Sequence, residues 1–158
     1  MSATLMNLAR GKVQGGSVLI EQALTVLVMV SVMFGAIDFG RALYTYHYVS
    51  YIARDATRWA SVRSTSLNGG PIAPGDVQTY VSNVSGMGLD PASITSTTNW
   101  IAPPNGTPLC PSAASNPANQ KPGCIVQVTV NYSYHFFLPF LAGRTFTMSS
   151  ESQMIITQ

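Results

Sequence analysis

Charged residues are scarce in this sequence: Asp, Glu, Lys and Arg make up 9% of its 158 residues, against roughly a quarter in ordinary soluble domains. Eight Lys and Arg stand against six Asp and Glu, which gives a net charge of +2. Cations this thinly spread cannot neutralise the run of phosphates that nucleic-acid binding requires. Two cysteines are also too few to build a zinc site by themselves. The composition therefore argues against nucleic-acid binding and against a zinc module.

The sequence also lacks the motifs that carry common catalytic chemistry. It has no Gly-x-Ser-x-Gly turn, no Walker loop, no paired metal-ligand motif and no phosphate-binding glycine pattern after a strand. His135 has no carboxylate or second histidine at ligand spacing. His47 lies among tyrosines, which favours interfacial anchoring or domain packing over metal binding. We therefore expect no enzymatic activity, no catalytic residue, no metal and no cofactor.

Hydrophobic residues, by contrast, make up 46% of the chain, and they concentrate near the N-terminus. Residues 17–37 read SVLIEQALTVLVMVSVMFGAI, with Glu21 as the single charge. As a helix this run would extend about 31 Å, roughly the hydrocarbon thickness of a bilayer. Arg10 and Lys12 precede it, which favours an N-terminus on the cytoplasmic side. We predict a transmembrane helix over residues 17–37.

A buried core helix and a cleaved secretory signal both fit the apolar run less well. A buried core helix would need apolar cover on every side, and a chain of this size has too little other apolar surface to supply it. A cleaved secretory signal would need small residues at the last and third-last positions, but Phe34 precedes Ala36. The run is therefore predicted to be retained as an anchor.

The helical pattern continues beyond the apolar run over residues 38–63. Small and apolar residues recur there at three- and four-residue spacing, until Gly69, Gly70 and Pro71 end the pattern. A helix from Ser17 to about Arg63 would be about 70 Å long. Asp38 and Arg41, three residues apart, are predicted to pair on its surface and to mark the exit from lipid.

Residues 64–158 carry the pattern of a small α+β domain. Asp76 is a candidate N-cap of a short helix, because the valines and Tyr80 that follow it have helical spacing. Three runs rich in β-branched and aromatic residues then predict strands over residues 94–100, 125–134 and 145–156. Alternation in the second run indicates one buried face. We expect an antiparallel sheet of about three strands.

Residues 102–123 form a predicted loop that holds six of the ten prolines. Cys110 lies within this loop and Cys124 directly follows it. A disulfide between them would contribute roughly 3 kcal/mol in the chain-entropy model and would persist only in an oxidising compartment. The alternative is two unrelated buried thiols. The disulfide is the prediction, and it places this domain outside the cytoplasm.

The N-terminal residues resemble a known processing signal. A short polar leader ends at Gly16, and Ser17 and the apolar helix follow, with Glu21 as the fifth residue after the glycine. This arrangement is similar to a type IV prepilin site. Residues 35–41, 53–60, 128–132 and 149–152 extend the likeness, and the chain resembles the TadE-like minor pseudopilins of tight-adherence pili.

The resemblance implies a function and a set of partners. A prepilin peptidase would remove residues 1–16 by cutting between Gly16 and Ser17. The protein would then assist assembly or initiation of a tight-adherence pilus. Its partners would be membrane lipid, other pilins or pseudopilins and the assembly platform, and its C-terminal domain would lie in the periplasm of a bacterial inner membrane. The alternative is an uncleaved bitopic anchor with a periplasmic protein-binding domain.

Under this resemblance Glu21 would act in assembly. A carboxylate inside an apolar segment costs on the order of 3 kcal/mol near mid-membrane, so it needs a positive partner or a place near the interface. Cleavage would create an amino group on Ser17, of the same or a neighbouring subunit, that could pair with Glu21. The alternative is that Glu21 sits at headgroup level near the helix start, where the helix dipole favours a negative charge.

Overall fold

The computed structural model describes residues 13–64, 72–85, 88–103, 120–137 and 143–157. The chain forms two compact units, one up to Arg41 and the other Ala42–Gln158. Helix α1 (Val13–Arg63) begins in the first unit and ends in the second. The predicted long helix is confirmed, although it starts at Val13 rather than at Ser17. The predicted segment boundary after residue 37 and the boundary between the two units after Arg41 are close to each other.

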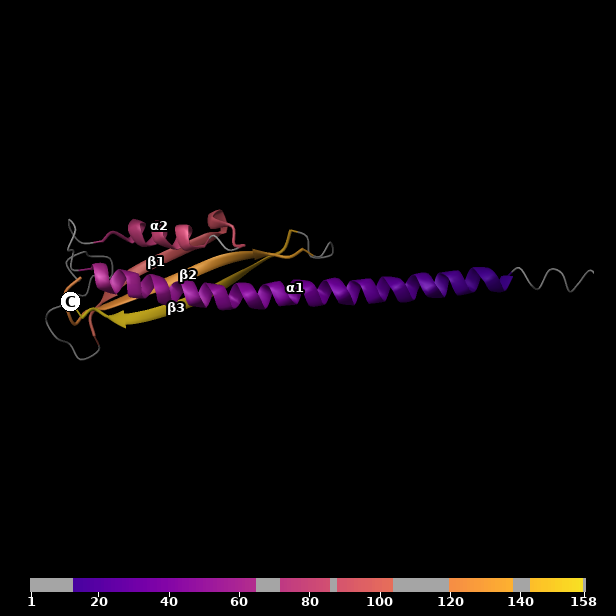
Figure 1. The fold of residues 1–158 in the computed structure, drawn as a ribbon, viewed down its shortest axis with the longest axis horizontal. Helices are drawn as coiled ribbons and strands as arrows, with labels where there is room; N and C mark the ends of the chain where they lie inside the picture. The colour runs from indigo at the N-terminus through magenta and orange to yellow at the C-terminus, as the bar shows by residue number, and fades with distance from the viewer. Residues whose placement is uncertain (1–12, 65–71, 86–87, 104–119, 138–142, 158) are drawn as a thin grey trace, which may run out of the picture. The chain divides into compact units, whose positions relative to one another are not determined.

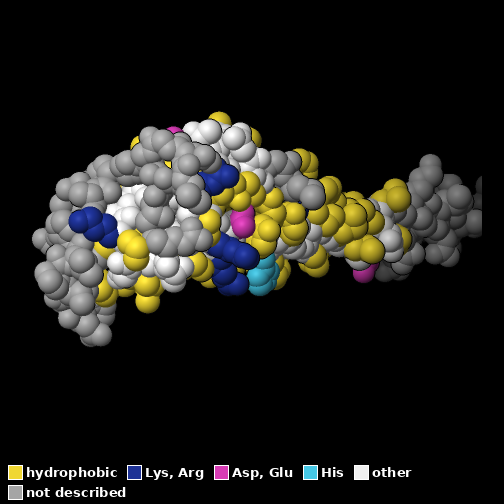
Figure 2. Space-filling view, turned by 60° about the vertical axis from the view of Figure 1, so that its left-hand side comes forward, with side chains coloured by type: hydrophobic (Ala, Val, Ile, Leu, Met, Phe, Trp, Pro, Cys, Tyr) yellow, Lys and Arg dark blue, Asp and Glu magenta, His cyan; other side chains and the backbone are white. Residues whose placement is uncertain are grey.

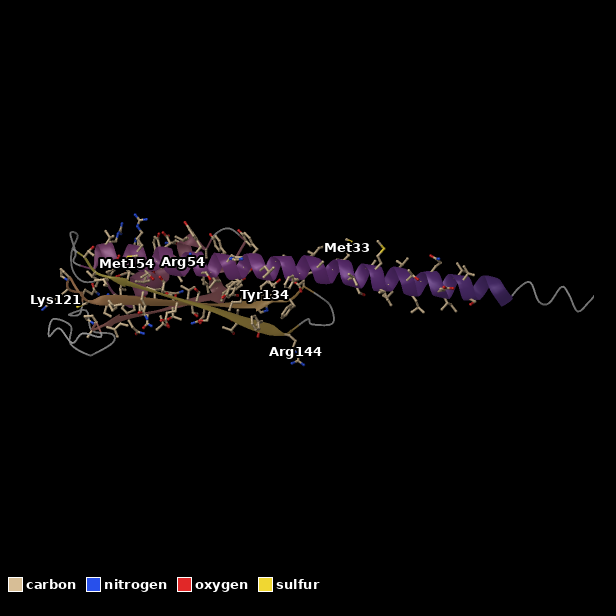
Figure 3. The ribbon with its side chains drawn as sticks, turned by 90° about the horizontal axis from the view of Figure 1, so that it is seen from below. Met33, Arg54, Lys121, Tyr134, Arg144 and Met154 are labelled. Atoms are coloured by element: carbon tan, nitrogen blue, oxygen red, sulfur yellow. The ribbon has the colours of Figure 1, made fainter. Side chains whose placement is uncertain are left out.

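The second unit contains the predicted sheet. Strands β1 (Ile94–Ile101), β2 (Ile125–His135) and β3 (Thr145–Ile155) lie in the order β1-β2-β3, and each neighbouring pair is antiparallel. Their bounds agree with the predicted strands to within one residue at each end. Figure 3 shows Met154 toward one end of β3 and Arg144 just before the other end. The α+β fold class is confirmed.

The core lies between one face of the sheet and a layer of two helices. On β2 the even-numbered residues from Val126 to Tyr134 are buried, and the odd-numbered residues form a polar outer face. From α1, small residues such as Ala53, Ala56 and Ala60 are fully buried, which lets the helix approach the sheet closely. The core is made up of Val49, Ile52, Ala53, Ala56, Ala60, Ile72, Val77, Val81, Leu89, Ile94, Trp100, Cys124, Val126, Val128, Val130, Tyr132, Tyr134, Met148 and Ile156.

Helix α2 (Pro74–Val84) is the second helix of the layer, and it packs against β1 (Figure 1). Its N-cap is Ala73, so the prediction of Asp76 as N-cap is wrong. Asp76 lies three residues further on and its Oδ2 accepts a hydrogen bond from the Ala73 N–H at 2.9 Å. The helix starts earlier because Pro74 suits the first helical turn, where no amide donor is needed. A short 3₁₀ turn, η1 (Pro91–Ser93), leads into β1.

Helix α1 lies over β3 on the core face. Thr57 Oγ1, which donates mainly to the Ala53 carbonyl, lies 3.3 Å from the Ser152 carbonyl oxygen, and Ser61 Oγ donates to Met154 Sδ at 3.2 Å. The later residue of α1 contacts the later residue of β3, so α1 and β3 run in the same direction. Helix α2 runs the opposite way beside α1, because Tyr48 contacts its last residue, Val84, and Asp55 contacts Tyr80.

Candidate membrane anchor and processing site

The N-terminal part of α1 exposes its apolar side chains. Leu19 and Met29 are 73% and 71% exposed, and the other large hydrophobic residues up to Ile37 are also exposed. Figure 2 shows hydrophobic side chains over this part of the molecule. A continuous apolar surface of this kind is unfavourable in water and marks a contact with lipid or with protein. Among the described residues, one helix is long and apolar enough to cross a membrane, and it is α1. These features suggest a membrane anchor.

Polar side chains inside the apolar segment bond to the helix itself. The Thr25 hydroxyl donates to the Glu21 carbonyl at 2.9 Å, and Ser31 Oγ donates to the Leu27 carbonyl at 2.8 Å. Each hydroxyl therefore reaches back one turn along the helix. Because lipid offers no hydrogen-bond partners, this internal pairing is what a membrane-embedded hydroxyl requires.

Gly16 and Ser17 lie in the first turns of α1. No atom lies within 4 Å of the position that a Cβ on Gly16 would take. Glycine costs a helix roughly 1 kcal/mol relative to alanine. The packing of the described residues therefore does not require a glycine at this position, and the role of Gly16 in processing stays a prediction.

Glu21 lies one turn after Ser17 on α1, about 6 Å along the helix axis, and its side chain is exposed. In the intact chain the nitrogen of Ser17 belongs to a peptide bond. The proposed amino-group partner of Glu21 therefore exists only after cleavage, and its pairing with Glu21 stays a prediction.

Asp38 and Arg41 lie together, as their spacing predicted, with Asp38 Oδ1 3.7 Å from Arg41 Nη1. The two side chains differ in burial: Asp38 is 3% exposed, whereas Arg41 lies in solvent. Asp38 is thus not the surface residue that the sequence suggested. The apolar neighbours Ile37 and Phe39 are exposed instead, which reverses the usual pattern of a water-soluble helix.

A group of tyrosines follows the apolar segment. The rings of Tyr44 and Tyr51 stack on either side of Tyr48, with centroid distances of 5.9 and 6.1 Å. The Tyr48 hydroxyl donates to the Val84 carbonyl of α2 at 2.9 Å, and burial, together with the two neighbouring tyrosines, raises the pKa of Tyr48. Tyr44 and Tyr51 stay exposed, and exposed aromatic rings near an apolar segment are typical of membrane interfaces.

A second cluster was not found from the sequence. The Tyr80 hydroxyl donates to Asp55 Oδ2 at 2.7 Å, and the Tyr80 ring stacks on Trp59 at 4.7 Å. The Arg63 guanidinium lies 4.8 Å from the centre of the Trp59 ring, within cation–π range. These residues join α1 to α2. Because Tyr80 is distant from the others in sequence, no local pattern indicates the contact.

The predicted disulfide lies only partly within the described residues. Cys124 is fully buried directly before β2, but Cys110 lies outside the described residues, so the disulfide stays a prediction. Directly after β2, the ring of Phe136 meets Tyr134 edge-on at 5.4 Å and Phe137 is exposed. Within the described ranges, no group of three or more His, Cys, Asp or Glu residues could hold a metal ion.

These features define a class of protein: an apolar N-terminal helix suited to membrane anchoring, followed by a small α+β domain. Within that class, residues 16–58 match the family described as TadE-like protein. The match begins at the predicted cleavage glycine and lies wholly within α1. The predicted TadE-like resemblance is therefore confirmed over these residues, and it is consistent with a protein of the tight-adherence pilus system. No curated protein and no solved structure matches the chain significantly.

Proposed function

We propose that this chain is a minor pseudopilin that assists assembly or initiation of a tight-adherence type IV pilus. The observation that carries the proposal is the TadE-like match over residues 16–58, because it covers the exposed apolar helix. A soluble protein would bury this surface, whereas an assembling pseudopilin uses it first in lipid and then against other helices.

The proposed sequence of events begins in the inner membrane. The leader stays in the cytoplasm, and a prepilin peptidase hydrolyses the Gly16–Ser17 peptide bond. The new amino group of Ser17 then offsets the charge of Glu21 within one subunit or between neighbours. Loss of this charge penalty would favour packing of α1 against pilin helices or the assembly platform.

The C-terminal domain would lie in the periplasm. The proposed Cys110–Cys124 disulfide is consistent with a periplasmic domain, because such a bond persists in an oxidising compartment. Alkylation of the unfolded, unreduced protein tests it: the bond requires both thiols to be blocked until a reductant is added. Two reactive thiols in the unfolded, unreduced protein from cells would contradict this orientation argument.

Cleavage is tested by Gly16→Leu in cells that contain or lack the peptidase. The wild-type chain should lose residues 1–16 only when the peptidase is present, and Gly16→Leu should keep them. Gly35→Leu is the matched control, because Gly35 also lies in α1 with open space around it, and this variant should still be cut. The new N-terminus is read by mass spectrometry.

An intact N-terminus in wild-type cells with active peptidase would contradict the proposal. That result would favour an uncleaved bitopic anchor whose periplasmic domain binds another envelope protein. Cleavage that is normal in Gly16→Leu would also contradict it, because the glycine would then have no role in recognition.

A further inference from the structure

The outer surface of the helix layer has an uneven distribution of charge. We call this surface the helix-layer face. It is formed by the exposed residues Tyr44, His47, Tyr51, Arg54 and Arg58 of α1 and Asp76, Thr79 and Asn83 of α2. On the α1 side the charged residues of this face are both arginines, whereas on the α2 side the one charged residue is an aspartate.

The nearby residues of opposite sign have partners of their own. Asp55 of α1 is partly buried and accepts the Tyr80 hydroxyl between the two helices, and among the described residues no ion pair joins it to Arg54 or Arg58. Arg63 stacks on Trp59. The face therefore presents a positive strip, with Arg54 and Arg58, beside a negative strip whose charge is that of Asp76, which also accepts the Ala73 N–H. Exposed Tyr44 and Tyr51 add apolar contact area to the positive strip.

We propose that the helix-layer face is a self-association surface, on which α1 of one copy lies against α2 of a second copy. A twofold axis parallel to the helices would place each positive strip over the partner's negative strip. Such an interface is self-complementary, since both contacts are made by the same two surfaces. Charge complementarity selects a second copy as the partner.

The direction of the chains favours the same symmetry. Two copies anchored through α1 in one membrane must have their helices running in the same direction. A twofold axis parallel to α1 preserves that direction, whereas a twofold axis across the helices would reverse it. The proposed dimer is therefore compatible with anchoring of both copies.

The contacts within one copy also identify which residues meet. Tyr80 touches both Asp55 and Trp59, so this part of α2 lies level with residues 55–59 of α1. A rotation about an axis parallel to the helices keeps the position of each residue along that axis. Arg58 of one copy is therefore expected to lie level with Thr79 of the other. Asp76 lies three residues before Thr79 on α2, which is about one helical turn and within the reach of an arginine side chain.

The size of the face predicts a weak dimer. Two helices about 10 Å across that overlap along the length of α2, about 16 Å, give on the order of 300 Å² per copy. This is well below the roughly 800 Å² per partner of a stable complex. The association should therefore depend on protein concentration and on charge screening, and confinement in a membrane would strengthen it.

The test is a charge exchange in the full-length chain in detergent micelles, with mass measured by sedimentation over a range of concentrations and at low and high salt. Arg58→Glu and Thr79→Lys should each weaken the dimer about tenfold, because each change places like charges together twice in the symmetric interface. The double variant R58E/T79K should recover wild-type association, because the exchange restores opposite charges. Salt should weaken the wild-type dimer.

Arg144→Glu is the matched control. Arg144 is exposed just before β3, outside the helix-layer face, and its replacement should leave association unchanged. Thermal unfolding of each variant separates lost association from lost fold. A wild-type chain that stays monomeric at all concentrations, or a double variant that associates no better than the single variants, would overturn the proposal. The test involves no peptidase, so its outcome is independent of the cleavage experiment.

Discussion

The side-chain amide of Gln78 on α2 bonds to Ser96 on β1 in the way that a neighbouring strand would. Gln78 Oε1 accepts the Ser96 backbone N–H at 2.5 Å and the Ser96 hydroxyl at 2.8 Å. Its Nε2 donates to the Ile94 carbonyl at 3.1 Å. Because β1 is an edge strand, these backbone groups face away from the sheet, and the amide satisfies them. One side chain thus ties α2 to the sheet.

Gln78→Glu should destabilise the domain. The change keeps an acceptor for Ser96 but removes the donor to Ile94 and sets a carboxylate oxygen against a carbonyl oxygen. The expected loss is about 1–3 kcal/mol of unfolding free energy. Urea unfolding followed by tryptophan fluorescence measures it, because Trp59 and Trp100 both lie in the domain. Thr79→Glu adds the same charge at an exposed neighbouring position and should change stability little. A Gln78→Glu chain as stable as wild type would contradict this role of the amide.

Tyr80→Phe should also destabilise the domain, by about 1 kcal/mol, since it removes the hydrogen bond to Asp55 and keeps the stacking on Trp59. The contact is partly exposed, which places the loss at the low end of values for a charged partner. Tyr44→Phe is the control, because the Tyr44 side chain is exposed. Equal stability of Tyr80→Phe and wild type would show that the bond contributes nothing.

The same hydrogen bond predicts in which direction the stability of the domain changes with pH. The hydrogen bond to Asp55, with smaller contributions from burial and from the Asp55 charge, raises the pKa of Tyr80 from 10.0 to about 12. A phenol whose folded-state pKa is raised stabilises the fold fully below its unfolded pKa and loses that contribution as the pH rises through the folded value. The stability difference between wild type and Tyr80→Phe should therefore be constant up to about pH 10 and should shrink toward pH 12. A difference that stays constant across this window would argue against the Asp55 bond as its source.

Thr98 and Thr57 should respond in opposite ways to replacement by valine. Thr98 Oγ1 is buried on β1 and has no hydrogen-bond partner among the described residues. Thr57 Oγ1 donates to the Ala53 carbonyl at 2.6 Å and reaches Ser152. Thr98→Val should leave the unfolding free energy unchanged or raise it by up to about 1 kcal/mol, whereas Thr57→Val should lower it by about 1 kcal/mol. Paired thermal unfolding of the two variants measures the contrast, and equal losses in both would contradict it.

Glu21→Gln should reduce pilus formation without affecting the domain. The change keeps the size of the side chain and removes its charge, so membrane insertion should be unimpaired or slightly favoured. Association with partner pilins should fall, because the amino group of Ser17 would lose its counter-charge. Pilus counts, cleavage and domain stability are measured together. Wild-type pilus numbers with normal cleavage would leave Glu21 as an interfacial residue hydrated near the helix start.

The sequence by itself determined the elements and the anchor. The apolar run, the helical spacing up to Arg63 and the alternation in β2 each depend on residues close together in the chain. Local periodicity reports them directly. Gly16, Ser17 and Glu21 also stand out by their spacing, and the TadE-like match over residues 16–58 includes them, while their roles in processing and assembly stay predictions.

The tertiary structure decided which side chains meet. The bond of Gln78 to Ser96, the bond of Tyr80 to Asp55 and the burial of Asp38 leave no mark in the local pattern. The first two contacts arise because the fold brings α2 beside β1 and beside α1. Even the start of α2 was misread from the residue type at Asp76, because a carboxylate can cap a helix from its first turn as well as from the N-cap position. Neighbouring residues in the sequence determine whether a segment forms a helix or a strand. Which side chains that segment then contacts is determined by the packing of the whole domain.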